Sequence, residues 1–396
     1  MPACLSRELI EKVLDDPGLD EQTIARCTRL SRTFLEYGRT RLYETVTIPF
    51  VTVPSGLGDP IWELSRTGTS TFHRICRFPS VAKSIRRIRF DYEYADSEGG
   101  LDVSPNQIFE AIMRRCPNLD SLELLPGFEE ECETFFQTVY PKLRRNIKSL
   151  DLGRPGEGLW DVLEAVQDSL VELKFGDKSN AGWYGVEDPP SDDLLPNLHL
   201  ETLHIECWGD EDEDDVTKQQ AVFDALTENS LQSLRTLSLE YASDILNDFS
   251  SFTNLRRLTL NVHATYHGFD ALSDTPALPA SLTSLTLSGL LLPDEADKLF
   301  GDAPETGILR ILPSKLEHLR LPQGLFPRHL LAFLAALPSS SKLRFVETPR
   351  TWRNSVHWPT PESEAEDDLG PVVEAFAENG IRVEVINGGE WCAPEF

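Results

Sequence analysis

The segment LRRLTLNV, residues 255–262, carries leucines at positions 255, 258 and 260. An amphipathic helix would place apolar residues at i, i+3, i+4 and i+7, whereas a half-buried strand would alternate them strictly. This segment instead has one leading leucine followed by an alternating pair. The pattern predicts a short strand, with Leu258 and Leu260 facing inward and Leu255 packed in the turn before them.

The same spacing recurs along the chain, with other apolar residues in place of some leucines. Nine segments fit it, and their starts lie 21 to 34 residues apart. Recurrence at such a period is typical of repeat architectures, in which one repeat cannot bury its apolar face without its neighbours. The nine begin at Ile85, Leu119, Ile147, Leu170, Leu200, Leu234, Leu255, Leu282 and Leu316, and weaker matches begin at Tyr43 and Leu343.

Helical patterns lie between these motifs, and Pro105 stands where the first turn of a helix favours proline. The alternation resembles the leucine-rich repeat in its irregular form. That resemblance implies an α/β solenoid with short parallel strands on the concave side and helices on the convex side. The asparagine ladder usual in such repeats is missing. The expected helices occupy residues 104–116, 158–169, 216–230, 294–300 and 327–337.

The first 48 residues have a different apolar period. One helical face ends before Pro17-Gly18, Asp20 is placed to cap a second helix, and a third helix begins near Arg32. Three short helices bury too little surface to be stable alone. They must therefore pack on the repeats or on another protein.

Two segments of this region, LSRELIEKVLDD (5–16) and TIARCTRLSRTFLEYGRTRLYETVTI (23–48), resemble the F-box of fungal F-box proteins with irregular leucine-rich repeats. Ser6 stands where members usually have proline. The resemblance implies docking to the Skp adaptor of a cullin-based ubiquitin ligase. The residues that it places at the adaptor are Leu5, Leu9, Ile10, Leu14, Ile24, Leu30 and Phe34. The alternative is that some of them only pack the three helices together.

These patterns predict a three-helix F-box-like domain, residues 1–48, and a leucine-rich-repeat solenoid, residues 49–396. Acidic loops are expected near 176–197, 209–215 and 360–368, and the alternating segment 381–388 predicts a last strand that caps the solenoid. The expected function is substrate recognition in a ubiquitin ligase. The alternative is an interaction scaffold outside ubiquitin transfer, whose F-box-like helices only cap the repeats.

Charge and motifs narrow the classes of function. The formal net charge of −28 repels phosphate backbones and anionic lipids, which argues against nucleic acid and membrane partners. The seven cysteines form no CxxC pair, and neither GxGxxG nor HExxH occurs. We therefore expect an intracellular protein, cytoplasmic or nuclear, without a catalytic site, a cofactor or a metal.

The residues between the inward leucines are expected to bind the target. Carboxylates dominate the central repeats, and like charges on one curved surface concentrate the potential. The expected target is therefore a protein rich in Lys or Arg. The residues expected to bind it are Glu123, Asp151, Glu172, His204, Glu206, Glu240, Arg257 and Asn261.

Overall fold

The chain is an α/β protein whose strands are mostly parallel. It divides into two compact units: unit 1 comprises Met1–Gly176 and Tyr184–Leu198, and unit 2 comprises Asp177–Trp183 and His199–Phe396. The boundary expected at residue 48 lies inside the first strand of unit 1. The computed structural model describes residues 10, 12, 14, 19–30, 32–53, 61–92, 105–124, 146–153, 158–177, 188–191, 195–207, 213–240, 249–261, 278–289, 312–323, 325, 327–349 and 369–386.

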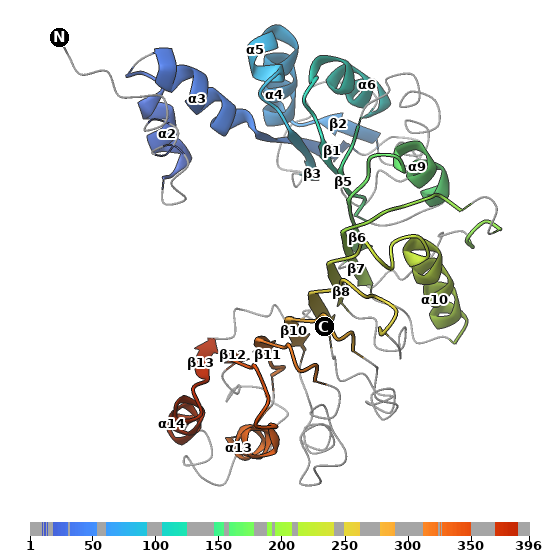
Figure 1. Ribbon diagram of the computed structural model, residues 1–396. Helices are drawn as coiled ribbons and strands as arrows, with labels where there is room; N and C mark the ends of the chain where they lie inside the picture. The colour runs from blue at the N-terminus through green and yellow to red at the C-terminus, as the bar shows by residue number, and fades with distance from the viewer. Residues whose placement is uncertain are drawn as a thin grey trace. The chain divides into compact units, whose positions relative to one another are not determined.

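Two helices precede the sheet of unit 1: α2 (Glu21–Cys27) and α3 (Arg32–Tyr43). Asp20 caps α2, because its carboxylate accepts a hydrogen bond of 2.6 Å from the backbone N–H of Thr23. Both helix starts expected from the sequence are confirmed, and residues 10, 12 and 14 are helical as well. Helix α3 leads directly into strand β1 (Thr45–Val53), as Figure 1 shows.

The sheet of unit 1 has the strand order β6-β5-β4-β3-β1-β2. Strand β2 (Ile61–Leu64) pairs antiparallel with one side of β1, and the remaining strands are parallel to β1 and follow in chain order from its other side. Each of these parallel strands is formed by residues of one repeat motif. They are β3 (Arg87–Tyr92), β4 (Ser121–Glu123), β5 (Ser149–Asp151) and β6 (Glu172–Asp177).

The helices of this repeat region lie together on one side of the unit 1 sheet (Figure 1). Two of them confirm expected helices: α6 (Pro105–Arg115) and α9 (Leu159–Val166). Helix α4 (Arg66–Arg77), which the sequence did not predict, is capped by the buried hydroxyl of Ser65 at 3.0 Å from the N–H of Gly68. The short helix α5 (Pro79–Ala82) follows it.

Unit 2 has seven described strands in the order β13-β12-β11-β10-β9-β8-β7, all parallel. Six carry a repeat motif, and β13 is the expected last strand. Their bounds are β7 (Thr202–Cys207), β8 (Thr236–Glu240), β9 (Arg257–Asn261), β10 (Ser284–Ser288), β11 (His318–Arg320), β12 (Phe345–Pro349) and β13 (Arg382–Ile386).

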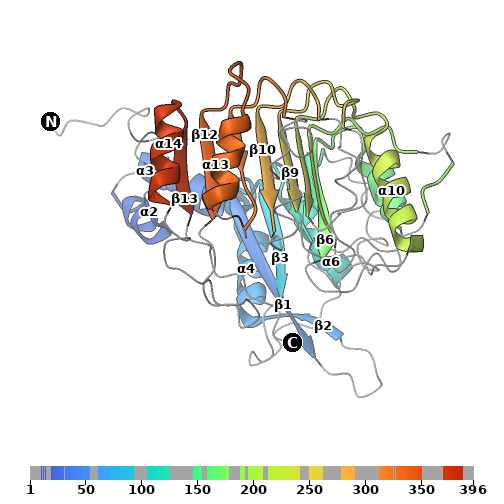
Figure 2. The same ribbon diagram turned by 90° about the horizontal axis from the view of Figure 1, so that it is seen from below.

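Three helices of unit 2 are described: α10 (Glu213–Thr227), α13 (Pro327–Ala336) and α14 (Gly370–Glu378). The acidic loop expected over 209–215 is wrong in part, because residues 213–215 form the start of α10. Acidic residues at a helix N-terminus are favoured by the helix dipole, so the charge run does not exclude a helix. Figure 2 shows α13 beside α14, where the rings of Phe333 and Phe376 stack at 6.3 Å. The expected helix over 294–300 lies outside the described residues.

The core follows the alternation that the motif predicts. The leading residue of each described motif is buried, as Ile85 and Leu234 are, and so are nearly all of the inward pairs. Leu258 is 1% exposed, whereas Leu260 is half-buried. The residues that alternate with these leucines, such as Arg257 and Thr259, lie on the opposite face of the strand.

A main-chain contact repeats from motif to motif. The residue after the leading one offers its carbonyl oxygen to two successive N–H groups of the next repeat. Arg86 thus accepts from Asp120 and Ser121 at 2.9 and 3.0 Å, and Arg235 accepts from Arg256 and Arg257 at 2.9 and 3.0 Å. We call this the shared-carbonyl contact. It uses no side chain, so it fixes the register whatever residue stands there.

Candidate functional site

Four of the expected adaptor-binding residues form one buried cluster at the N-terminal helices: Ile10, Leu14, Ile24 and Phe34. Leu19, Cys27, Tyr37 and Leu42 are packed against them. These four residues therefore hold the helices together, as the alternative interpretation of the sequence has it. Leu5 and Leu9 lie outside the described residues.

Leu30 differs from that cluster in its exposure. It lies in the turn after α2, where its N–H donates to the carbonyl of Cys27 at 2.9 Å, and its side chain is 70% exposed. Among the described residues it is the most exposed large hydrophobic side chain. Among the expected adaptor residues that the structure describes, Leu30 is therefore the one with an exposed apolar side chain.

The turn that carries Leu30 is held against α3. A side chain at Gly38, on α3, would overlap the methyl group of Thr28, which is two residues before Leu30. The hydroxyl of Thr28 donates to the carbonyl of Ala25 at 2.7 Å, which fixes that methyl group in place. The backbone of the turn that carries the exposed leucine is therefore held in a defined position.

The polar face of the unit 1 strands carries alternating ion pairs. Arg89, Glu123, Asp151 and Lys174 form one row across four strands, in register. The Nε of Arg89 lies 3.2 Å from Oε1 of Glu123, and the Nζ of Lys174 lies 3.5 Å from Oδ2 of Asp151. Glu172 is exposed on β6. Two carboxylates expected to attract a basic target are therefore neutralised by neighbours.

The polar face of the unit 2 strands is mostly hydroxyl and basic. His204 is half-buried and shares a register row with Ser238, Thr259, Thr286 and Arg320. Arg257 is exposed on β9. Glu206 and Glu240 pair in register through their backbones, but their side chains, like that of Asn261, lie outside the described part of the chain.

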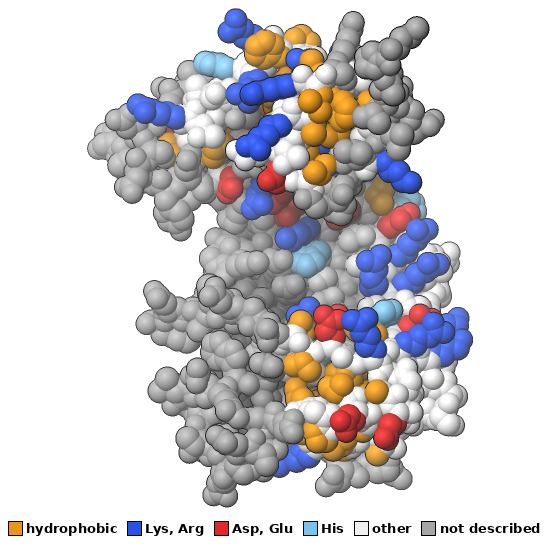
Figure 3. Space-filling view, turned by 90° about the vertical axis from the view of Figure 1, so that its left-hand side faces the viewer, with side chains coloured by type: hydrophobic (Ala, Val, Ile, Leu, Met, Phe, Trp, Pro, Cys, Tyr) orange, Lys and Arg blue, Asp and Glu red, His pale blue; other side chains and the backbone are white. Residues whose placement is uncertain are grey.

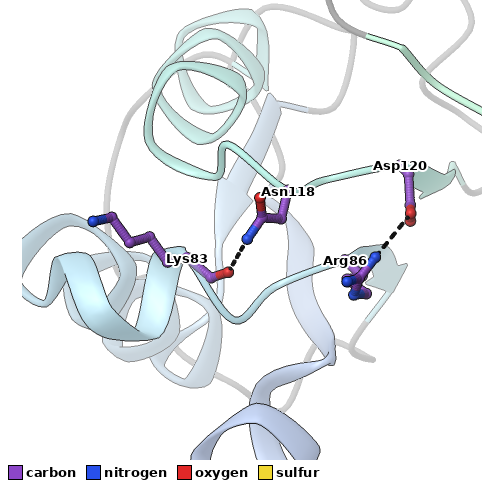
Figure 4. Close-up of polar contacts among 4 residues, drawn as sticks. All are labelled: Lys83, Arg86, Asn118 and Asp120. Carbon is purple, nitrogen blue, oxygen red and sulfur yellow. Dashed lines mark hydrogen bonds and ion pairs between the residues drawn. The ribbon is translucent and has the colours of Figure 1, made fainter.

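Sequence reasoning missed the residues just before each strand. Arg86 and Asp120 face each other at 3.4 Å, and the amide of Asn118 donates to the carbonyl of Lys83 at 2.6 Å (Figure 4). In unit 2, Arg235 and Glu201 repeat the ion pair at 3.4 Å. The available signal was the second position of the motif, which is charged in most repeats.

Serine one residue before the motif supplies a further missed contact. The hydroxyls of Ser169, Ser233 and Ser281 donate to the carbonyls of Ile147, Leu200 and Leu255 at 2.8, 2.8 and 2.7 Å. Each acceptor is the leading residue of the preceding motif. This serine series links consecutive repeats.

Within the described residues, no group of three or more His, Cys, Asp or Glu side chains is placed to hold a metal ion. Burial raises the pKa of the Cys76 thiol, and the nearby Arg115 opposes that change only in part. Over the same residues, no helix is both long and apolar enough to cross a membrane.

No family model and no curated protein matches this chain.

Proposed function

We propose that this chain is the substrate receptor of a cullin-based ubiquitin ligase. Its N-terminal helices are an F-box that docks the Skp adaptor, and its leucine-rich repeats bind a target protein through their strand face. It has no catalytic site of its own. The observation that carries the proposal is Leu30, a leucine 70% exposed beside a helical cluster whose other described apolar residues are buried or partly buried.

The repeats support the second half of this proposal. A receptor needs a broad surface whose side chains can vary without loss of the fold. The strand faces of both units offer such a surface, because the inward positions make the core and the register is held by main-chain contacts. Residues between the inward ones are free to serve recognition.

Adaptor capture tests the proposal directly. The purified chain is mixed with the Skp adaptor, and bound adaptor is quantified for the wild type, Leu30→Asp and the matched control Leu331→Asp. Leu331 is also partly exposed, but it lies on α13 in unit 2. Losing one buried leucine contact corresponds to roughly tenfold to a hundredfold weaker binding. We expect that loss for Leu30→Asp alone, with circular dichroism unchanged.

Substitution of Leu14 cannot replace this test. Its side chain is 2% exposed, so a charge there would unfold the helical cluster. Binding would then be lost because the fold is lost, and the result would not show whether Leu14 contacts the adaptor. If the wild-type chain captures no adaptor, the proposal fails. The scaffold interpretation, in which these helices only cap the repeats, then takes its place. Affinity capture with and without residues 1–42, read by mass spectrometry, identifies the target in either case.

A further inference from the structure

Two adjacent arginines of unit 2 have no acidic partner among the described residues: Arg257 is the first residue of β9, and Arg256 immediately precedes that strand. Both side chains are exposed. Within the described part of the chain, neither side chain makes an ion pair or a hydrogen bond. In a protein of net charge −28, exposed arginines without carboxylates beside them require an explanation.

A third arginine lies beside these two. Arg235 precedes β8, and its carbonyl accepts the shared-carbonyl contact from Arg256 and Arg257. Neighbouring strands are about 4.8 Å apart, so the three side chains start from adjacent points of the backbone. Glu201, the partner of Arg235, comes from the repeat before it, on the side away from Arg256.

The surroundings of these arginines are rich in hydroxyl groups. Thr236 and Ser284 flank Arg257 in register, and Thr283 follows Arg256 through its shared-carbonyl contact. Among the described side chains of β7 to β11 there is no carboxylate, and the side chains of Glu206 and Glu240 lie outside that set. On β11, His318 is exposed, and Arg320 is paired with Glu347 of β12 at 3.8 Å. Figure 3 shows Lys and Arg side chains along its right-hand side, with histidine and Asp or Glu side chains among them.

Glu201 is paired with Arg235, and the other acidic residues of these repeats lie further from Arg256 and Arg257. Glu317 lies two repeats beyond Arg256 in the row of shared carbonyls, with Thr283 between them. Glu240 is four residues along β8 from Thr236, which is about 13 Å at strand spacing. That separation exceeds the screening length of about 8 Å at physiological ionic strength. Positive potential therefore persists where β8 and β9 begin.

We propose that Arg235, Arg256 and Arg257, with Thr236 and Ser284, bind an acidic peptide segment bearing at least two Asp or Glu side chains. That the segment belongs to a target protein rests on the function proposed above. The planar guanidinium group matches a carboxylate with two parallel hydrogen bonds, and the hydroxyls donate further ones. The net charge of −28 makes the average surface repel anions, so binding of the segment depends on a local group of arginines such as this one.

A labelled peptide tests the inference without the adaptor. Fluorescence anisotropy measures the binding of fluorescein-Gly-Glu-Gly-Glu-Gly-Glu to the full chain at low and high salt. The same peptide with Gln or with Lys in place of Glu gives the comparison. We expect the Glu peptide alone to bind, and more weakly as salt rises, because exposed charge pairs are screened.

Charge reversal locates the site. Arg256→Glu/Arg257→Glu should weaken the Glu peptide by roughly tenfold or more, since two attractive contacts become repulsive. The control Arg29→Glu/Lys83→Glu makes the same change of charge at exposed residues of unit 1 and should leave binding unchanged. Should the reversed variant misfold, Arg256→Gln/Arg257→Gln should still weaken binding.

Three results would overturn the inference: no binding of the Glu peptide by the folded wild type, equal weakening by the control pair, or tighter binding of a 12-mer single-stranded RNA. The last would mark the surface as a nucleic acid site. Adaptor capture is measured separately. If the chain binds the Glu peptide but not the adaptor, this inference stands and the proposed function fails. If it binds the adaptor but not the Glu peptide, the proposed function stands and this inference fails.

Discussion

Arg89 on β3 and Glu123 on β4 face each other in register, with 3.2 Å between Nε and Oε1. Asp151 and Lys174 repeat the arrangement two strands further along the same row. Exposed pairs of this kind contribute only about 0–1 kcal/mol each to stability. Their main effect is on the potential of the face, because the two carboxylates of this row, Glu123 and Asp151, each have a cation beside them.

The register of the repeats predicts unequal losses from neighbouring residues of β9. Leu258→Ala removes a side chain that is 1% exposed and should cost about 2–5 kcal/mol of unfolding free energy. Thr259→Ala, on the opposite face, should change it by less than about 0.5 kcal/mol. Denaturant unfolding of both variants measures the difference. Similar losses for the two would contradict the alternation of buried and exposed positions.

The contact between α4 and β1 predicts that alanine harms a helix position it would normally favour. A side chain at Gly68 would run into the carbonyl oxygen of Pro49, so Gly68→Ala should destabilise unit 1 by about 1–3 kcal/mol. Thr67→Ala, exposed in the same turn, should be neutral or slightly stabilising, since alanine has the higher helix propensity. Thermal unfolding of both compares them. A stabilised Gly68→Ala variant would show that α4 does not approach β1 closely.

The serine series predicts a modest but specific loss. Ser233→Ala removes the hydroxyl that donates to the carbonyl of Leu200 and should cost about 1 kcal/mol. Ser284→Ala is the control, because this half-buried serine on β10 has no side-chain hydrogen bond in the described part of the chain. Chemical denaturation under identical conditions gives both values. Equal costs would mean that the serine before the motif does not link repeats.

The cap of α2 predicts a shifted titration. The hydrogen bond from the Thr23 side chain, and then that from its backbone, hold the pKa of Asp20 below its usual value of 3.8. Since the folded pKa is lowered, the stabilisation is present above the usual value and is lost as pH falls through the folded one. Carboxyl carbon NMR should give a midpoint below 3.8 for the wild type, and Thr23→Val should raise it. An unchanged midpoint in Thr23→Val would exclude the hydroxyl as the cause.

The strands could be predicted because their signal is a repeated spacing that depends only on which residues are apolar. Helices α6, α9 and α13 also carry clear apolar faces. Helix α4 was not predicted, because its sequence RTGTSTFHRICR contains threonine, serine and glycine, which have low helix propensity. The cap at Ser65, which is local, and the packing of Gly68 on β1 stabilise it, and the second of these depends on Pro49, which is distant in the sequence.

The sequence could predict the group of candidate adaptor residues but not which of them are exposed. Ile24 and Leu30 are both apolar and lie six residues apart, yet one is buried and the other is 70% exposed. Helix α2 ends at Cys27, so Leu30 follows a turn and leaves the helical face that Ile24 occupies. The F-box resemblance assigns both residues to the adaptor, because a sequence match does not show which side chains the fold buries. The ion pairing of Glu123 was likewise hidden, because it depends on the strand that lies next to it.

The shared-carbonyl contact also bears on how such a chain can change in length. The register of each strand is held by main-chain atoms at its start, so the residues that connect two strands do not determine it. The cost of closing a longer connection grows slowly, by about 0.6 kcal/mol for each doubling of its length. Starts spaced anywhere from 21 to 34 residues are therefore compatible with one regular sheet in each unit. Insertions and deletions between strands can accumulate in evolution, or be engineered to carry a reporter domain, while the strand face keeps its spacing.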